Sequence, residues 1–249
     1  MIIIPARIGS SRFPNKVLAD IAGLPMVIRT AKAVNSIDEV LIATDSQEVV
    51  DIAKTHQIKA ILTANTHTSG TDRIYEAVQK LQLPQDEIIM NVQGDEPFIE
   101  TAVVQAVYNL TKQHQHHPEI LMNSCYKAMT NPESDDPNIV KVVTDEKDIA
   151  LYFSRAKIPY PRDHHFDAYK GHIGIYGFTV QSLRTFCTLT PAPLENIEKL
   201  EQLRVLYHGY KVAMTEVITK SFGIDTPEDL EKALRNLQQP LNPNYAIEL

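Results

Sequence analysis

A regular alternation of short apolar runs and helix-spaced apolar residues constrains the fold more than any other feature of this chain. The apolar runs predict strands at 2–4, 40–43, 59–62 and 87–92, and the helical periodicity predicts helices at 25–34, 47–55 and about 101–113. A further helix is expected to follow a cap at 68–72 and to run to about residue 81. Strands that alternate with helices in this way form a parallel sheet covered on both faces. We therefore expect an α/β fold: a three-layer, Rossmann-like, mostly parallel sheet with helices on both faces.

The pattern changes after residue 120. Strands are expected at 120–126, 139–144, 149–153 and 172–179, with helices at 181–187 and 194–206, a last strand at 212–218 and a closing helix after Pro227. Residues 120–190 are too poor in strands to bury a core alone, so they predict an antiparallel extension of the parallel sheet. We expect a single domain over 1–239 and a C-terminal tail over 240–249.

The loop after the first strand is rich in cations. It carries Arg7, Arg12 and Lys16 among small residues that let the backbone approach an anion, which suits a polyphosphate. It matches neither the Walker A pattern nor the dinucleotide pattern G-x-G-x-x-G. The alternative is a basic loop that is merely solvated.

Two carboxylates follow strand ends elsewhere in the chain. Asp95 lies in Gln93-Gly-Asp-Glu, and Asp225 lies in Gly223-Ile-Asp. Ligands of open α/β sheets bind at the carboxyl ends of strands, so both carboxylates are expected near the phosphates of a ligand bound by the opening loop. Carboxylates that face phosphates need a cation between them, and Mg²⁺ is the usual one. The alternative for each is a turn or helix cap, with Thr226 and Pro227 starting a helix.

Composition excludes several classes of protein. A net charge of −7 and a pI near 5.7 argue against a general nucleic-acid binder. No apolar run approaches the roughly 20 residues of a membrane span, and a first strand at residue 2 leaves no room for a signal peptide. Cys125 and Cys187 form no motif, so a reduced, cytoplasmic location is expected.

Several sequence blocks carry a resemblance to a known family. They are IIPAR at 3–7 with R-x-P-x-K at 12–16, SGTDR at 69–73, NVQGDEP at 91–97, YFSRA at 152–156, HIGIYG at 172–177, EQLR at 201–204 and GIDTPED at 223–229. In this order they resemble the sugar nucleotidyltransferases, and within them the cytidylyltransferases that act on 3-deoxy-manno-octulosonate (KDO). The resemblance runs from residue 2 to about 235.

The resemblance implies a reaction. CTP and KDO would give CMP-KDO and diphosphate for lipopolysaccharide assembly in a Gram-negative cytoplasm, with the anomeric hydroxyl attacking the α-phosphorus. By the same resemblance Arg7, Arg12 and Lys16 would hold the triphosphate, and Asp95 and Asp225 would bind catalytic Mg²⁺. Positioning and charge neutralisation supply most of the rate in such transfers.

The resemblance also implies the remaining binding residues. Ser69, Gly70, Thr71 and Arg73 would lie by the cytosine and ribose, with Gln93 between nucleotide and sugar, and Arg155, His172, Tyr176 and Glu201 would bind the sugar acid. Because KDO is an anion, Arg155 and His172 suit it as cations. From the residues alone, His172 and Tyr176 are equally well explained as ordinary residues of a strand, and Glu201 as the partner of Arg204 in a surface ion pair.

Two further expectations concern the acceptor and the assembly. The stretch 161–171 is shorter than the resemblance implies for this loop near the sugar. An 8-amino analogue of KDO or another sugar acid therefore stays an alternative acceptor, as does a relative that binds the nucleotide without catalysis. Members of the family are typically homodimers through the antiparallel extension, which corresponds to residues 120–190 here.

Overall fold

The computed structural model describes residues 1–9, 13–163 and 166–238. They form two compact units. The first comprises Met1–Leu81, Asn91–Val104 and the chain from Lys220 onwards, and the second comprises Gln82–Met90 and Gln105–Thr219. The expected single domain over 1–239 stays a prediction, and the expected tail over 240–249 lies outside the described residues.

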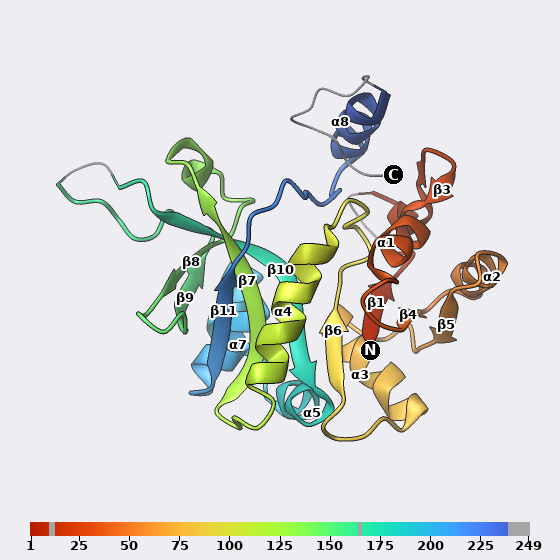
Figure 1. Ribbon diagram of the computed structural model, residues 1–249, viewed down its shortest axis with the longest axis horizontal. Coiled ribbons are helices and arrows are strands. Elements are labelled where there is room, and N and C mark those ends of the chain that lie inside the picture. Colours follow the sequence, from red (N-terminus) through yellow and green to blue (C-terminus); the bar gives the residue numbers. More distant parts are fainter. Residues whose placement is uncertain (10–12, 164–165, 239–249) are drawn as a thin grey trace. The chain divides into compact units, whose positions relative to one another are not determined.

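Parallel strands form the centre of the first unit (Figure 1). They are β1 (Ile2–Ala6), β4 (Val40–Thr44) and β5 (Lys59–Leu62), connected by the helices α1 (Met26–Val34), α2 (Gln47–Thr55) and α3 (Gly70–Leu81). β1 pairs in parallel with β4, which pairs in parallel with β5. Both β1 and β4 are buried along their whole length, as expected for strands covered on both faces.

The segment after β6 (Ile88–Asn91) closes tightly onto β1. The Val92 N–H donates to the Ile3 carbonyl at 3.4 Å. A Cβ at Gly94 would lie 3.0 Å from the backbone oxygen of Pro5, so only glycine lets this segment lie against β1 without displacement. The carboxyl ends of β1 and β6 are thereby fixed beside each other, directly before Arg7 and Asp95.

The C-terminal part of the first unit packs on the segment that follows Asp95. The Ile224 N–H donates to the Asp95 carbonyl at 2.9 Å, and the Ser221 hydroxyl donates to the Phe98 carbonyl at 3.0 Å. Ile224 belongs to a buried apolar cluster with Ile21, Met26, Phe98 and Ala233. This packing brings Asp225 to Asp95 although 130 positions separate them in the sequence.

Helix α8 (Pro227–Gln238) starts as the sequence predicts. The Thr226 hydroxyl accepts from the Asp229 N–H at 3.2 Å, and the Asp229 carboxylate accepts from the Thr226 N–H at 3.0 Å. This reciprocal cap satisfies two backbone donors at the helix start.

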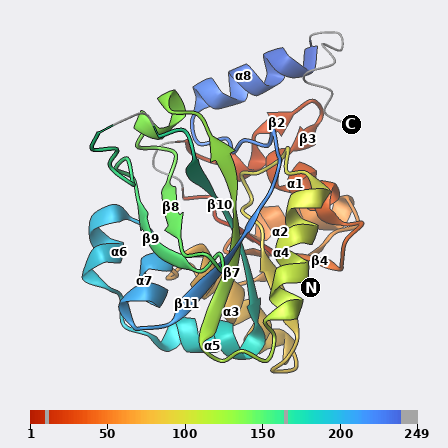
Figure 2. The same ribbon diagram turned by 60° about the vertical axis from the view of Figure 1, so that its left-hand side comes forward.

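Antiparallel pairing dominates the second unit (Figure 2). Its strands are β7 (Ile120–Met129), β8 (Lys141–Thr144), β9 (Ala150–Ser154), β10 (Tyr169–Thr179) and β11 (Lys211–Glu216). β10 pairs antiparallel with β7 and β8, β8 pairs antiparallel with β9, and β11 runs parallel to β7. The helices of this unit are α5 (Val180–Thr188), α6 (Pro193–Glu198) and α7 (Gln202–Tyr207). Helix α4 (Thr101–Gln113) precedes β7.

The fold class is confirmed: an α/β chain with a mostly parallel sheet and flanking helices. The antiparallel strands of the second unit fit the expected extension, and its use for dimerisation stays a prediction. The small elements of the fold were not expected from the sequence. They are the strands β2 (Asp20–Ile21) and β3 (Leu24–Pro25) and the 3-10 turns η1 (Lys16–Leu18) and η2 (Pro132–Asp135).

The predicted helix over 194–206 is wrong as one helix. Lys199 adopts a left-handed conformation with φ of 55° and ends α6, and α7 begins three residues later. Apolar spacing alone does not reveal the break, because a lysine at this position carries no turn signal.

Candidate functional site

A pocket of about 340 Å³ in the first unit collects most of the predicted nucleotide residues. Of the predicted residues, Arg7, Lys16, Ser69, Gly70, Arg73, Gln93, Asp95 and Asp225 line it. They come from the end of β1, the turn η1, the start of α3, the segment after β6 and the residues before α8. A cavity of this size holds a small molecule, and its polar groups converge from separate parts of the chain.

Lys16 lies between the two predicted metal-binding carboxylates. Its ammonium donates to Asp95 Oδ2 at 2.6 Å and to Asp225 Oδ1 at 3.1 Å. Burial would lower the pKa of Lys16, but the charges and hydrogen bonds of Asp95 and Asp225 outweigh it and raise the pKa above its ordinary value. Lys16 is therefore a permanent cation, and both carboxylates are directed at one point.

The two carboxylates fit a hard cation in part. Asp95 and Asp225 present oxygens within hydrogen-bond reach of the same atom, and carboxylate oxygens are the ligands that Mg²⁺ prefers. Among the described residues no group of three or more histidine, cysteine or acidic side chains could hold a metal. A cation here would thus need phosphate oxygens and water to complete its shell, as is usual for Mg²⁺ bound with a nucleotide.

Of the two arginines of the basic loop, Arg7 lies within the described residues. Arg7 follows β1 directly, is exposed and lines the pocket. Arg12 lies outside the described residues, so its part in holding a triphosphate stays a prediction.

The first turn of α3 forms another side of the pocket. Ser69 caps this helix: its hydroxyl accepts from the Asp72 N–H at 3.1 Å and donates to the Asp72 carboxylate at 2.8 Å. A Cβ at Gly70 would meet the ring of Pro5 at 3.1 Å, so glycine lets the helix start lie against β1. Thr71 is fully buried beside Asn91 and, unlike Gly70, does not line the pocket.

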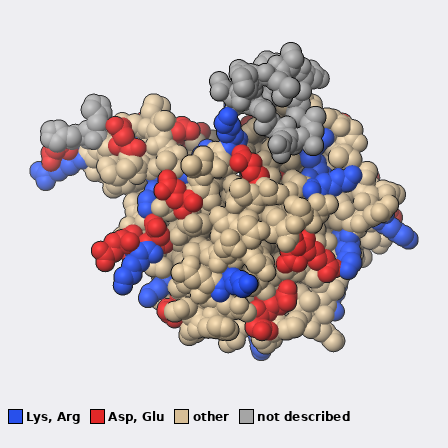
Figure 3. All heavy atoms as spheres, viewed as in Figure 1, with Lys and Arg blue, Asp and Glu red and all other residues tan. Residues whose placement is uncertain are grey.

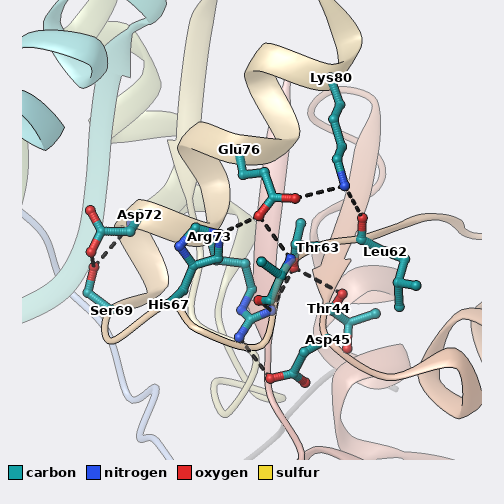
Figure 4. Close-up of polar contacts among 11 residues, drawn as sticks. Thr44, Asp45, Leu62, Thr63, His67, Ser69, Asp72, Arg73, Glu76 and Lys80 are labelled. Atoms are coloured by element: carbon teal, nitrogen blue, oxygen red, sulfur yellow. Dashed lines mark hydrogen bonds and ion pairs between the residues drawn. The ribbon is translucent and has the colours of Figure 1, made fainter.

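Arg73 lines the pocket, but its guanidinium is held by the protein (Figure 4). It is 2% exposed and donates to Asp45 Oδ2 at 2.9 Å and to the Thr63 hydroxyl at 2.6 Å. A third bond runs to the Ala64 carbonyl at 3.3 Å. These contacts make Arg73 a support of the segment 63–69 as well as a residue of the pocket.

Gln93 lines the pocket beside the start of α3. Its Nε2 donates to Asn91 Oδ1 at 3.1 Å, and its Oε1 lies near the Cα of Gly70, where an added Cβ would be 3.7 Å away. The predicted nucleotide contact of Gln93 fits this position.

The predicted sugar residues lie in the second unit. Arg155 follows β9 and is anchored by its Nε, which donates to the Glu198 carbonyl at 2.8 Å, and by its Nη1, which donates to the Pro137 carbonyl at 3.1 Å. A guanidinium has five N–H donors in one plane, so these two bonds orient the group and leave donors for a carboxylate.

His172 and Tyr176 lie together on β10. Their ring centroids are 5.6 Å apart, and the His172 Nε2 lies 2.9 Å from the Ser124 hydroxyl. Because that hydroxyl donates to the Ile175 carbonyl at 2.8 Å, it accepts from an Nε2–H of His172. The Nδ1 of the neutral ring is then a hydrogen-bond acceptor.

The expectation that His172 acts as a cation is wrong. Burial lowers the pKa of His172 to about 3, so the ring is neutral at physiological pH. Burial also raises the pKa of Tyr176 well above its ordinary value, with the negative charge of Glu201 adding to the effect. The two rings are therefore uncharged, and Arg155 is the cation among the predicted sugar residues.

Glu201 lies just before α7, near enough to Tyr176 to influence its pKa. The bidentate partner of Arg204 is Glu195, with distances of 2.9 and 2.6 Å, rather than the Glu201 that the helical spacing suggested.

Three residues near these sites were not expected from the sequence. Gln202 is 1% exposed, accepts from the Tyr176 hydroxyl at 3.3 Å, and its Nε2 has no hydrogen-bond partner among the described residues. It directly follows Glu201, so the same block could have indicated it. Ser124 orients His172, and His67 lines the nucleotide pocket; neither carries a signal in the sequence beyond its closeness to a predicted residue or strand.

Two observations concern the protein classes that the composition argues against, a general nucleic-acid binder and a membrane-spanning protein. On the face drawn in Figure 3, basic and acidic side chains are interspersed over the described residues. None of the helices in the described ranges has the length and apolar character needed to cross a membrane.

Comparison with known proteins agrees with this geometry. A family model described as "Cytidylyltransferase" matches residues 1–214. The chain is 56% identical over 232 residues to a 3-deoxy-manno-octulosonate cytidylyltransferase of Nitratiruptor sp., covering 93% of this chain and 97% of the relative. It is 50% identical over 243 residues to the protein of that name from Wolinella succinogenes, covering 94% and 98%.

A solved structure is similar over nearly the same length. CMP:2-keto-3-deoxy-manno-octonic acid synthetase complexed with CTP superimposes with a TM-score of 0.88 at 37% sequence identity, covering 96% of this chain and 98% of that one. A cytidylyltransferase from Leptospira borgpetersenii, 16% identical with a TM-score of 0.61, shares the fold.

Proposed function

Since this chain belongs to the cytidylyltransferase family, we propose that it transfers the cytidylyl group of CTP to KDO, giving CMP-KDO and diphosphate. The observation that carries the proposal is the convergence of Asp95 and Asp225 on Lys16 in a pocket that the capped start of α3 also lines. This arrangement suits a triphosphate with its counter-ion. The relatives named for the same reaction supply the substrates.

Different residues of the pocket bind the phosphates and the nucleoside in this proposal. Lys16, which is a cation throughout the accessible pH range, and Arg7 neutralise the triphosphate and stabilise the negative charge that builds on the departing diphosphate. Ser69, Gly70 and Gln93 bind the nucleoside side, and Arg12 completes the grip on the phosphates.

Asp95 and Asp225 hold Mg²⁺ in this proposal. Their oxygens, which converge on one point, support it, and when bound the cation would supply Lewis-acid activation of the α-phosphorus. The two side chains also fix the position of Lys16 before the substrate binds.

On the sugar side, Arg155 binds the carboxylate of KDO through donors that its two backbone contacts leave available. The His172 Nδ1 accepts from a sugar hydroxyl, and Tyr176 and Glu201 complete the contacts with the hydroxyl groups. Because His172 is neutral, its loss should weaken sugar binding by a hydrogen bond and not by a charge.

The assembly and the setting belong to the same proposal. We propose a homodimer through residues 120–190, which expose Leu151 at 61% and Tyr160 at 82%, since such large apolar side chains favour a covered surface. A cytoplasmic enzyme that supplies CMP-KDO for lipopolysaccharide is the expected context. Light scattering at micromolar concentration tests the dimer.

Diphosphate release is the deciding assay. CTP and Mg²⁺ are supplied with KDO, 8-amino-KDO or a sialic acid, one at a time, and release with KDO at the highest kcat/KM is expected. Faster release with 8-amino-KDO or the sialic acid would reassign the acceptor. Tight CTP binding without release from any sugar would refute the enzyme and leave a nucleotide-binding relative.

A further inference from the structure

Helix α3 holds the segment that leads into its own start. Three of its charged side chains, spaced on one side of the helix, reach back to this segment, which is defined here as residues 62–69 and called the α3 entry segment (Figure 4). Arg73 bonds to Thr63 and Ala64, as described above, and Lys80 donates to the Leu62 carbonyl at 2.8 Å. The third is Glu76.

Glu76 makes contacts with both of its oxygens. Its Oε2 accepts from the Ala64 N–H at 2.9 Å and contacts His67 Nε2, and its Oε1 pairs with Lys80 at 2.7 Å. Burial would raise the pKa of Glu76, but the hydrogen bonds from Lys80, Ala64 and His67 lower it to about 2. Glu76 is therefore an anion that ties two points of the entry segment together.

The contact with Glu76 also determines the state of His67. An ionised carboxylate only accepts, so the His67 Nε2 must carry a proton. The other ring nitrogen, Nδ1, is then an acceptor in the neutral ring. A carboxylate behind an imidazole fixes both the tautomer and the orientation of the ring, as it does for histidines that bind metals.

The entry segment forms part of the nucleotide pocket. His67, Thr68 and Ser69 line the pocket, and Gly70, which also lines it, begins α3. Glu76 is not among the residues that line the pocket, and it lies one to two helical turns further along α3. Of its contacts with described residues, the one with His67 leads to the pocket, because His67 lines it.

We propose that Glu76 is a positioning residue for the nucleotide, acting through His67, and that His67 contacts the bound nucleotide. The inference rests on the proposed function, because it takes CTP as the occupant of the pocket. A preformed wall avoids the cost of ordering the ring when the ligand binds. Loss of Glu76 should therefore weaken the binding of CTP and leave the binding of the sugar and the rate of the chemical step nearly unchanged.

The test compares four variants of the full chain with the wild type. Glu76→Gln keeps the shape but removes the charge, and its amide can donate to His67 and so favour the other tautomer. His67→Ala removes the ring, and the double variant combines both changes. Lys80→Met is the matched control: it removes a partner of Glu76 on the same helix without touching His67.

Isothermal titration measures CTP affinity with Mg²⁺, and diphosphate release gives KM for each substrate and kcat. For Glu76→Gln we expect a roughly tenfold weaker Kd and a similar rise in KM for CTP. KM for KDO and kcat should stay within about twofold, and Lys80→Met should match the wild type. The double variant should bind CTP no more weakly than His67→Ala, because Glu76 acts through that ring.

Any of these results would overturn the inference: equal rises in KM for CTP and KDO, additive losses in the double variant, or the same loss in Lys80→Met. The last result would mean that any loss of contacts in the entry segment is enough to weaken CTP binding. A wild-type chain that fails to bind CTP would refute the proposed function itself. A wild type that binds CTP, with Glu76→Gln binding equally well, would refute the role of Glu76 alone.

Discussion

The stability of the chain in acid should depend on His172, because the folded chain keeps this ring neutral. Burial lowers the pKa of His172 from an ordinary 6.5 to about 3. Above pH 6.5 the ring is neutral in both the folded and the unfolded chain, so its titration does not change the free energy of unfolding there. As the pH falls below 6.5 the unfolded chain binds a proton, and the folded chain does not bind it until near pH 3. The folded state therefore loses stability as the pH falls through this window.

The size of the loss follows from the two pKa values. Each pH unit within the window costs about 1.4 kcal/mol. Between pH 7 and pH 5 the contribution of His172 to the free energy of unfolding should fall by about 2 kcal/mol. His172→Gln cannot bind the proton, so the variant should lose about 2 kcal/mol less than the wild type over the same interval.

Urea unfolding at pH 7, 6 and 5, followed by circular dichroism, measures the difference between the two proteins. Other titrating groups are common to both and cancel in the comparison. Parallel stability profiles would refute the reasoning. Proton NMR of the folded wild type provides a check that needs no variant: a His172 ring that titrates with a midpoint above about pH 5 would also refute it.

Three further predictions concern the metal, a helix cap and the packing of β10. Asp225→Asn should lower kcat at least about a hundredfold and weaken the dependence on Mg²⁺ with an unchanged circular dichroism spectrum, and near-normal turnover would contradict the metal assignment. Thr226→Ala removes the hydroxyl that accepts from the Asp229 N–H at the start of α8 and should reduce the free energy of unfolding by about 1 kcal/mol in urea titrations, whereas no change would show that this half of the cap is dispensable. Gly177→Ala places a Cβ against the hydroxyl of the buried Thr111 and should cost about 1–3 kcal/mol, and an unchanged thermal midpoint would show that the packing there can relax.

The sequence predicts well which residues meet in the pocket, because strand ends are determined by topology. Once strands alternate with helices, the residues after each parallel strand emerge at one edge of the sheet. Asp95 follows β6, and Arg7 follows β1, so their meeting in one pocket needs only the correct order of elements. The order of elements does not by itself place Asp225 in the pocket. The apolar packing of its neighbour Ile224 brings it to this pocket.

The sequence predicts the protonation of the sugar side less well. His172 looks like a cation beside an anionic substrate when only its type is known. Its neutral state comes from burial, with the ring centroids of Phe153 and Tyr176 5.0 and 5.6 Å away, and its orientation comes from the hydroxyl of Ser124 on a neighbouring strand. These contacts depend on the antiparallel register of β7 and β10, which residue spacing within one strand does not reveal.

Ion pairs show the same distinction between local and long-range signals. Arg204 has Glu201 three residues before it, which is a favourable helical spacing, yet its fork binds Glu195 nine residues away. The reason is the left-handed Lys199, which ends α6 and lets the chain turn so that α6 packs against α7. A continuous helix would have carried Glu195 more than two turns away from Arg204. A single backbone conformation therefore decided which carboxylate the guanidinium met, and local pairing rules could apply only after that turn was known.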